Sequence, residues 1–243
     1  MSAVYERELL LGSAHVDCFR RLRTSVLFDL LQEASIRHTE ALGFGREKTL
    51  DRGLAWVVTR QHVLVERMPV FDERIVVRSW PGETMHLLFP RYYELLDAHG
   101  ETLLRGSALW SLMDQTTRSA VFPDEYGIEI KGVQTGRETP YLVRLRTLET
   151  PNESPFRVPY SYVDLNGHMN NTRYFDLTDD LLPAVHRGEM LCEANVEYCA
   201  EAKLGEELHI AWGEEAGVYY VNGSKEHACF RMNLHYAEGR GDA

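Results

Sequence analysis

The spacing of apolar and polar residues predicts one long helix near the start of the chain. Between residues 24 and 43, the positions of a single helix face recur about every 3.6 residues. They are Leu27, Leu30, Leu31, Ala34, His38, Ala41 and Leu42. Thr24 or Ser25 is a suitable N-cap and Gly43 a suitable C-cap. Because His38 falls on this stripe, we interpret it as a core histidine rather than a catalytic one.

After this helix the pattern becomes that of β-strands. Four segments are rich in β-branched and aromatic residues, and they cover residues 54–66, 74–80, 86–97 and 101–114. Turn-forming residues separate them, so antiparallel hairpins are the simplest connection. An apolar run within residues 5–17 is a candidate first strand. The predicted unit is one long helix followed by a curled antiparallel sheet.

The same order of elements returns later in the chain. Residues 123–157 contain several prolines and glycines with weak periodicity, which is typical of a connecting segment. A helix is then predicted over about 172–182, with Asn170 or Asn171 as its N-cap and Pro183 as its stop. Strands are predicted in residues 194–212, 217–226 and 227–236.

The two halves also match in sequence. Val65 and Glu66 correspond to Val196 and Glu197, and residues 73–77 correspond to 206–210. Between these anchors the second copy is about two residues longer, around 200–203. Internal repeats indicate one structural unit used twice. The expected divisions are an N-terminal unit over 1–135, a linker over 136–156 and a C-terminal unit over 157–243.

Composition narrows the function classes. The chain has 243 residues, is 44% hydrophobic, and has neither a leader-like start nor an apolar run near the ~18 residues that a membrane span needs. A formal charge of −11 argues against general nucleic-acid binding. The scattered cysteines favour neither a disulfide framework nor a zinc site; they are Cys18, Cys192, Cys199 and Cys229. A soluble protein in the reducing cytoplasm is expected.

The candidate chemistry lies just before the second helix. Asp164, Asn166 and His168 are spaced two apart, so in an extended loop all three can point into one cavity while Leu165 and Met169 pack behind. The same residue types also form ordinary turns. In the first half the corresponding stretch is DCFRRLRTS, which lacks the motif. One half is therefore predicted to keep the chemistry while the other shapes a substrate pocket.

The start of the second helix can supply a further function. Backbone N–H groups near Asn170 and Asn171 carry the positive end of the helix dipole. Such groups can stabilise an oxyanion.

Five blocks in order carry a family resemblance: residues 29–45, 54–80, 107–118, 164–176 and 196–202. In these blocks the chain resembles the acyl-[acyl carrier protein] thioesterases of plants and bacteria. The resemblance implies an α+β fold, a tandem hotdog with two curved antiparallel sheets, each wrapped around a long helix. It also implies hydrolysis of fatty acyl-[acyl carrier protein] to free fatty acid and carrier protein in fatty acid biosynthesis, without cofactor or metal.

The resemblance also implies a set of catalytic residues, namely Asp164, Asn166, His168 and Glu201. The family usually has a cysteine after the glutamate, where this chain has Ala202, and Cys199 has the opposite strand parity. A water nucleophile is therefore preferred. Whether Asp164 or Glu201 activates it, or Asp164 attacks directly to form an anhydride, stays open.

Substrate contacts are predicted less specifically. Candidates to line an acyl tunnel are Trp56, Val58, Met68, Met85, Leu87, Trp110 and Met113. Candidates to dock the acidic carrier protein and its phosphopantetheine arm are Arg20, Arg21 and Arg23, or Lys131, Arg144 and Arg146. Neither a nucleic acid nor a membrane is expected as a partner, and a homodimer is left open.

Three other functions fit the same pattern. An acyl-CoA thioesterase differs only in the leaving group. A hotdog hydratase also uses Asp, Asn and His, but its common D-x-N-x-x-H loop is one residue longer than Asp164 to His168. A non-catalytic acyl-binding module would keep the fold without turnover.

Overall fold

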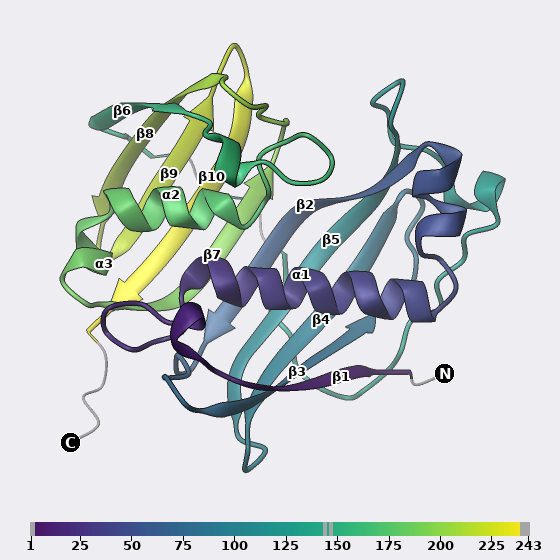
Figure 1. Ribbon diagram of the computed structural model, residues 1–243, viewed down its shortest axis with the longest axis horizontal. Coiled ribbons are helices and arrows are strands. Elements are labelled where there is room, and N and C mark those ends of the chain that lie inside the picture. The colour runs from purple at the N-terminus through teal and green to yellow at the C-terminus, as the bar shows by residue number, and fades with distance from the viewer. Residues whose placement is uncertain (1–2, 143–144, 146–147, 239–243) are drawn as a thin grey trace.

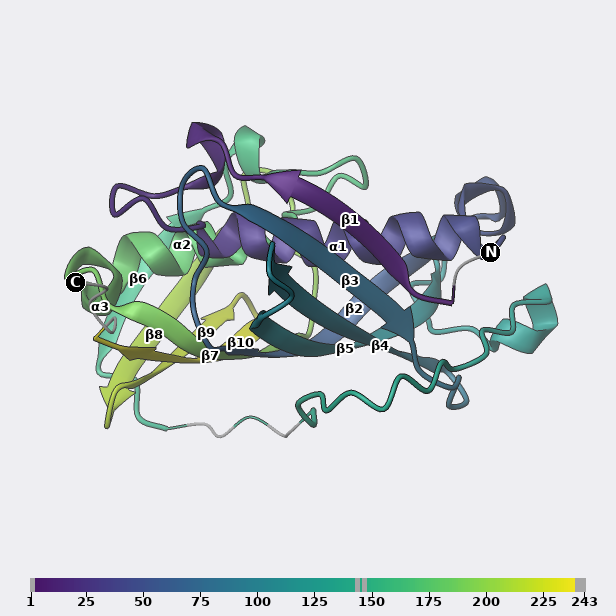
Figure 2. The same ribbon diagram turned by 90° about the horizontal axis from the view of Figure 1, so that it is seen from below.

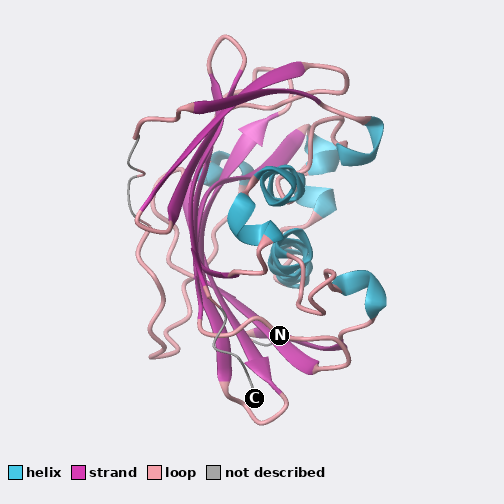
Figure 3. Cartoon of the chain, turned by 90° about the vertical axis from the view of Figure 1, so that its left-hand side faces the viewer, coloured by secondary structure: helices cyan, strands magenta, loops and turns pink. Residues whose placement is uncertain are grey.

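The computed structural model describes residues 3–142, 145 and 148–238. One continuous antiparallel sheet of ten strands curves around the helices, which all lie on its concave face (Figures 1 and 3). The strands are β1 Tyr5–Leu10, β2 Leu54–Val65, β3 Arg74–Pro81, β4 Leu88–Asp97, β5 Thr102–Asp114, β6 Asn152–Arg157, β7 Met190–Tyr198, β8 Glu207–Glu215, β9 Val218–Ser224 and β10 Ala228–Ala237. The helices are α1 Thr24–Ala41, α2 Arg173–Leu181 and α3 Pro183–His186.

The strand order confirms the internal repeat. The order is β1-β3-β4-β5-β2-β7-β10-β9-β8-β6, so each strand of the first half has a counterpart at the mirrored place in the second. The two expected sheets are not separate, because β2 and β7 pair with each other from Arg60↔Glu197 to Leu64↔Glu193. An ion pair of 3.1 Å between Arg60 and Glu197 crosses this join. The tandem hotdog thus has a single shared sheet.

Helix α1 follows its predicted stripe. Leu27, Leu31, Ala34 and His38 are buried, and so is Phe28, which the stripe did not include. The predicted cap was wrong: Arg23 is the N-cap residue, and no side chain bonds the helix start. Thr24 and Ser25 are instead buried in the first turn. Gly43, with φ of +86°, follows the helix in the left-handed conformation that favours glycine.

Helix α2 begins later than predicted. Its N-cap residue is Thr172, while the Asn170 side chain accepts the Thr172 N–H at 2.9 Å. The helix ends at Leu181, and Pro183 begins the short α3. Asp29 of α1 accepts hydrogen bonds from the Thr172 hydroxyl and the Arg173 guanidinium, both at 2.7 Å. The two halves therefore meet through their helices as well as their sheets.

Phe28 of α1 stacks on Phe175 of α2, with ring centroids 3.8 Å apart. Both rings are buried, at 1% and 0% exposure. We expect Phe175→Ala to lower the free energy of unfolding by about 3–5 kcal/mol, because it leaves a cavity where the helices meet. Phe122→Ala is the control, since Phe122 is 53% exposed and should cost under about 0.5 kcal/mol. Denaturant titration of both variants tests this, and equal losses would contradict it.

Before residue 143, the connecting segment runs along the face of the sheet away from the helices (Figure 2). It is held there by the Ser107 hydroxyl, which donates to the Pro140 carbonyl at 2.6 Å, and by His62, whose Nδ1 lies 2.6 Å from the Tyr141 carbonyl. Its last residues form β6, an edge strand paired with β8, which the sequence did not predict. None of the helices within the described residues is long and apolar enough to cross a membrane.

Candidate active site

The loop that carries the predicted motif is a tight turn. The Asp164 N–H donates to the His168 carbonyl at 2.9 Å, and Asp164 Oδ1 accepts the Asn166 N–H at 2.8 Å. Gly167 completes the turn at φ +80°, where a side chain would be strained. Met169 is buried as expected, but Leu165 is 87% exposed and does not pack behind the loop. The turn therefore fixes Asp164 and presents an apolar side chain to solvent.

Glu201 meets this loop from the segment between β7 and β8. A bridge between His168 and Lys203 aligns the two segments, and Nε2 of the His168 ring lies 2.9 Å from Glu201 Oε2. Arg118 forms an ion pair with Oε1 of the same carboxylate. Arg118 comes from the turn after β5, so the first half contributes to the cluster. Arg118 is the last residue of the 107–118 block that carries the family resemblance, but no sequence spacing predicts its contact with Glu201.

The surroundings keep His168 neutral near pH 7. Burial, followed by the positive charge of Arg118, lowers the pKa of His168 from its ordinary value of 6.5. A neutral ring with its proton on Nε2, the nitrogen beside the Glu201 carboxylate, has an unprotonated Nδ1.

This arrangement predicts a pH dependence. Activity is expected to fall as pH drops through the lowered pKa of His168, because protonation disrupts its neutral form. Unfolded His168 binds a proton more readily, so its contribution to the free energy of unfolding also falls below about pH 6.5. Arg118→Met should raise this pKa and move the acidic limb to higher pH. NMR titration of the ring and pH–rate profiles measure this, with Arg74→Met, an exposed arginine of β3, as the charge-matched control.

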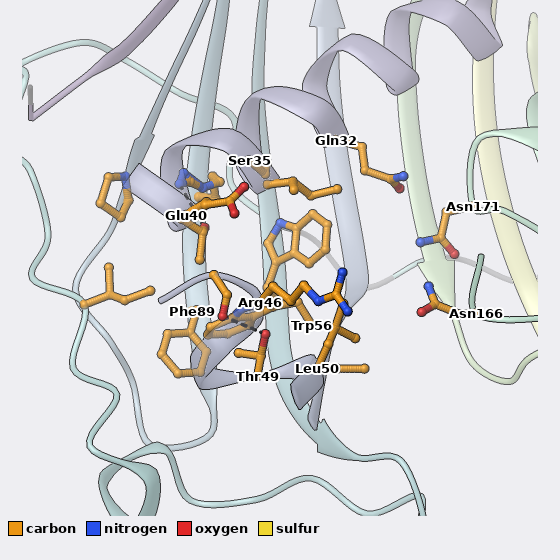
Figure 4. Close-up of a pocket in the computed structure, with 18 of the residues that line it drawn as sticks. Gln32, Ser35, Glu40, Arg46, Thr49, Leu50, Trp56, Phe89, Asn166 and Asn171 are labelled. Carbon is orange, nitrogen blue, oxygen red and sulfur yellow. Dashed lines mark hydrogen bonds between the residues drawn. The ribbon is translucent and has the colours of Figure 1, made fainter. Parts of the chain in front are cut away.

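A cavity of about 240 Å³ opens at the motif loop and extends beneath α1 into the first half (Figure 4). Asn166 and Asn171 lie at one end of it, and Glu40 and Phe89 at the other. Asp164 also lines the cavity, whereas His168 and Glu201 do not. The motif residues thus divide into a cavity-facing group and a supporting group.

Only some of the predicted tunnel residues line this cavity. Trp56 and Trp110 do. Val58 is core at 5% exposure, Met85 is 50% exposed, and Met68 lies beside a different cavity. Neither Leu87 nor Met113 is in the wall. The sequence could not select the lining residues, because alternate residues of a strand face opposite sides of the sheet and the curvature of the sheet decides which strands come close to the helix.

The helix start offers two backbone donors. The N–H groups of Asn170, Thr172 and Arg173 are already bonded within the chain. Within the described residues, the N–H groups of Asn171 and Tyr174 have no hydrogen-bond acceptor. Of these two residues Asn171 lines the cavity, so its N–H is a candidate donor to an oxyanion at this end.

The parity argument about Cys199 does not apply, because β7 ends at Tyr198 and the following segment is a loop. Ala202 is fully buried there, and its carbonyl accepts the Met169 N–H at 2.7 Å. Burial raises the pKa of the Cys199 thiol, which disfavours a thiolate at neutral pH. Of the described residues, no group of three His, Cys, Asp or Glu side chains is arranged to hold a metal.

The first half repeats the motif loop with different side chains. Asp17 Oδ1 accepts the Phe19 N–H at 2.9 Å, as Asp164 does for Asn166, and Arg21 bridges Val70 as His168 bridges Lys203. Phe19 and Arg21 therefore take the places of Asn166 and His168.

The predicted alignment of the halves was two residues out of register at Val65 and Glu66, whereas the match of residues 73–77 with 206–210 is in register. Glu66 and Arg67 both donate to the Leu103 carbonyl, just as Cys199 and Ala200 both donate to the Cys229 carbonyl. No extra residues are needed in the second copy, and Met68 takes the place of Glu201. The first copy thus lacks three of the four polar groups.

Arg20, Arg21 and Arg23, the first group proposed for carrier docking, all make contacts within the chain. Arg21 donates to the Gly188 carbonyl at 2.8 Å, Arg23 donates to the Val16 carbonyl at 2.9 Å, and Arg20 lies over the Phe71 ring. Lys131 is exposed, whereas Arg144 and Arg146 lie outside the described residues. None of these observations tests carrier docking, which stays a prediction.

Two family models cover most of the chain. The acyl-ACP thioesterase N-terminal domain matches residues 2–128, and the acyl-ACP thioesterase C-terminal domain matches residues 145–241. The chain belongs to the acyl-ACP thioesterase family. The family assignment agrees with the sequence resemblance. The unit boundaries expected at 135 and 157 stay a prediction.

Individual relatives agree with the family. The chain is 28% identical over 222 residues to the chloroplastic acyl-[acyl-carrier-protein] hydrolase FATB3 of Cuphea viscosissima, covering 82% of this chain and 52% of that protein. It is 27% identical over 214 residues to the chloroplastic dodecanoyl-[acyl-carrier-protein] hydrolase of Umbellularia californica, covering 82% of this chain and 56% of that protein. The chain spans about half the length of these curated relatives.

Solved structures of the same family share the fold. An acyl-ACP thioesterase from Bacteroides thetaiotaomicron superposes with a TM-score of 0.83 at 22% identity, covering 98% of this chain and 100% of that one. The 12:0-ACP thioesterase from Umbellularia californica gives 0.79 at 22% identity, covering 98% of each chain. These similarities confirm the hotdog architecture.

Proposed function

We propose that this chain hydrolyses fatty acyl thioesters of acyl carrier protein to the free acid and the carrier thiol, in fatty acid biosynthesis. The observation that carries the proposal is the position of Asp164, which lines the cavity of about 240 Å³, while His168 at the end of the same loop contacts Glu201. Family membership makes the acyl thioester the natural occupant of that cavity.

Of the two candidate carboxylates, we propose Asp164 as the base. Both oxygens of Glu201 are engaged, one by His168 and one by Arg118. Asp164 Oδ1 accepts the Asn166 N–H, which leaves Oδ2 for a water. In the proposed reaction Asp164 takes a proton from water as the hydroxide adds to the thioester carbonyl. The C–S bond then breaks, and the proton passes to the departing thiolate.

The remaining groups have supporting roles in this proposal. The N–H group of Asn171 stabilises the tetrahedral oxyanion, and the Asn166 amide orients water or substrate at the cavity end. His168 and Glu201 hold the loop in its working geometry. The raised thiol pKa of Cys199 supports water over a cysteine nucleophile.

The test measures release of free thiol and free acid from purified chain with acyl carrier protein loaded with fatty acids of graded length. Turnover at a rate well above that of the Asp164→Ala variant is expected. The same acyl groups on coenzyme A test the alternative leaving group, and equal or higher kcat/KM with coenzyme A would reassign the substrate. Binding without thiol release would instead favour an acyl-binding module.

A cytoplasmic location is also proposed, since all four cysteines are free thiols. Cell fractionation with an antibody to the chain tests it.

A further inference from the structure

The far end of the cavity contains a buried cation. Arg91 of β4 is 4% exposed and lines the cavity wall. Its Nη1 lies 3.3 Å from Nδ1 of His38, and its Nη2 lies 3.5 Å from the hydroxyl of Thr39. Arginine can only donate hydrogen bonds, so Nδ1 of His38 is the unprotonated acceptor in this contact. Both contacts are long and neither partner is a carboxylate.

Three other arginines, for example, do have carboxylate partners. Arg67 pairs with Glu73, and Arg78 and Arg137 both pair with Glu94. Within the described residues no carboxylate forms an ion pair with Arg91. Burial lowers the pKa of Arg91 to about 10, so the group is still charged at neutral pH. A buried charge without an opposite partner is unfavourable, unless a ligand supplies the missing acceptor.

The cavity places this cation opposite the proposed catalytic end. In Figure 4, Gln32 of α1 lies on the side of Asn166 and Asn171, whereas Glu40 lies at the other end. Arg91 is bonded to Thr39, the residue before Glu40. From Gln32 to Thr39 the helix rises by roughly 10 Å. An acyl chain with its thioester at Asp164 would therefore extend its distal end toward Arg91.

The walls between the two ends are mixed in character. Trp56, Phe89 and Ile36 supply apolar surface for an acyl chain. Ser35 lines the same cavity, with its hydroxyl bonded to the buried Tyr93 hydroxyl at 2.7 Å. A cavity meant for a methyl-ended chain alone gains nothing from a desolvated guanidinium in its wall.

We propose that the preferred substrate is an acyl thioester of medium chain length that carries an oxygen acceptor at its distal end, bound by Arg91. Arg91 is then a specificity-determining residue. This inference rests on the proposed function. Glu40 lines the same end of the cavity, but its side chain is exposed to solvent. Its negative charge therefore does not exclude a carboxylate on the substrate. The distal oxygen can belong to a neutral hydroxyl or to a carboxylate, and the experiment distinguishes the two.

The experiment compares matched thioesters on one carrier protein: straight chains of six to twelve carbons that end in a methyl, a hydroxyl or a carboxylate. At the best length, wild-type kcat/KM is expected to be about 10-fold to 100-fold higher for an oxygen-ended chain than for its methyl-ended match. Arg91→Met should remove this preference, and Arg91→Lys should retain part of it. Arg74→Met removes the same charge from an exposed site and should leave the ratio unchanged.

The outcomes separate this inference from the proposed function. If methyl-ended chains are hydrolysed best at every length, and Arg91→Met leaves the ratio unchanged, the distal-oxygen proposal is overturned while the hydrolase stands. If no thioester is cleaved, the proposed function fails, and calorimetry with non-hydrolysable thioether analogues of the methyl-ended and the carboxylate-ended chain still tests the cavity. Equal Kd values for the two analogues in wild type would overturn the inference. Because these comparisons use wild-type protein, they hold even if an Arg91 variant does not fold.

Discussion

Replacing Asp164 with Asn is expected to lower kcat/KM for acyl carrier protein thioesters by at least ~100-fold. The substitution keeps the side-chain size and an Oδ1 that can still accept the Asn166 N–H, so the turn should keep its shape. What it removes is the negative charge that faces the cavity and takes the proton from water. Thiol release in steady state measures the loss, and thermal unfolding checks that the protein remains folded.

The first half supplies a matched control for this prediction. Asp17 holds the equivalent turn, accepting the N–H groups of Phe19 and Arg21 at 2.9 Å, but it has no histidine or glutamate partner at the corresponding places. Asp17→Asn should therefore leave kcat/KM within about twofold of wild type. If folded Asp164→Asn kept more than roughly a tenth of the activity, Asp164 would not be the base.

The second large effect concerns the His168–Glu201 pair. His168→Ala and Glu201→Ala are each expected to lower kcat by at least ~100-fold, because either change frees the partner and loosens the loop around Asp164. The double variant should lose little more than either single one, since residues that act as a unit are not additive. Steady-state kinetics of the complete mutant cycle measures this coupling.

Glu207→Gln is the control for the pair. Glu207 is exposed on β8, and its replacement removes the same charge as a change at Glu201. It should be neutral in both activity and stability. Fully additive losses for His168→Ala and Glu201→Ala would show that the two side chains act independently, which would contradict the supporting role proposed for them.

Much of the site could be recognised from sequence because its parts are local. Asp164, Asn166 and His168 sit within five residues, where a turn alone brings them together, and Glu201 came from the family resemblance. Arg118 and Arg91 could not be found in this way. Arg118 contacts Glu201, and Arg91 contacts His38 near the end of α1. Both contacts join segments that are far apart in the sequence, so no local pattern marks them.

By itself the sequence determined the long first helix, most of the strands, the twofold repeat and the motif loop. These follow from hydrophobic periodicity and turn chemistry, which act over a few residues. Tertiary structure alone decided the joining of two sheets through β2 and β7, the edge strand β6, the helix caps and the register of the repeat. It also decided which side chains line the cavity. Those features depend on which strand edges and faces meet, and long-range packing sets that choice.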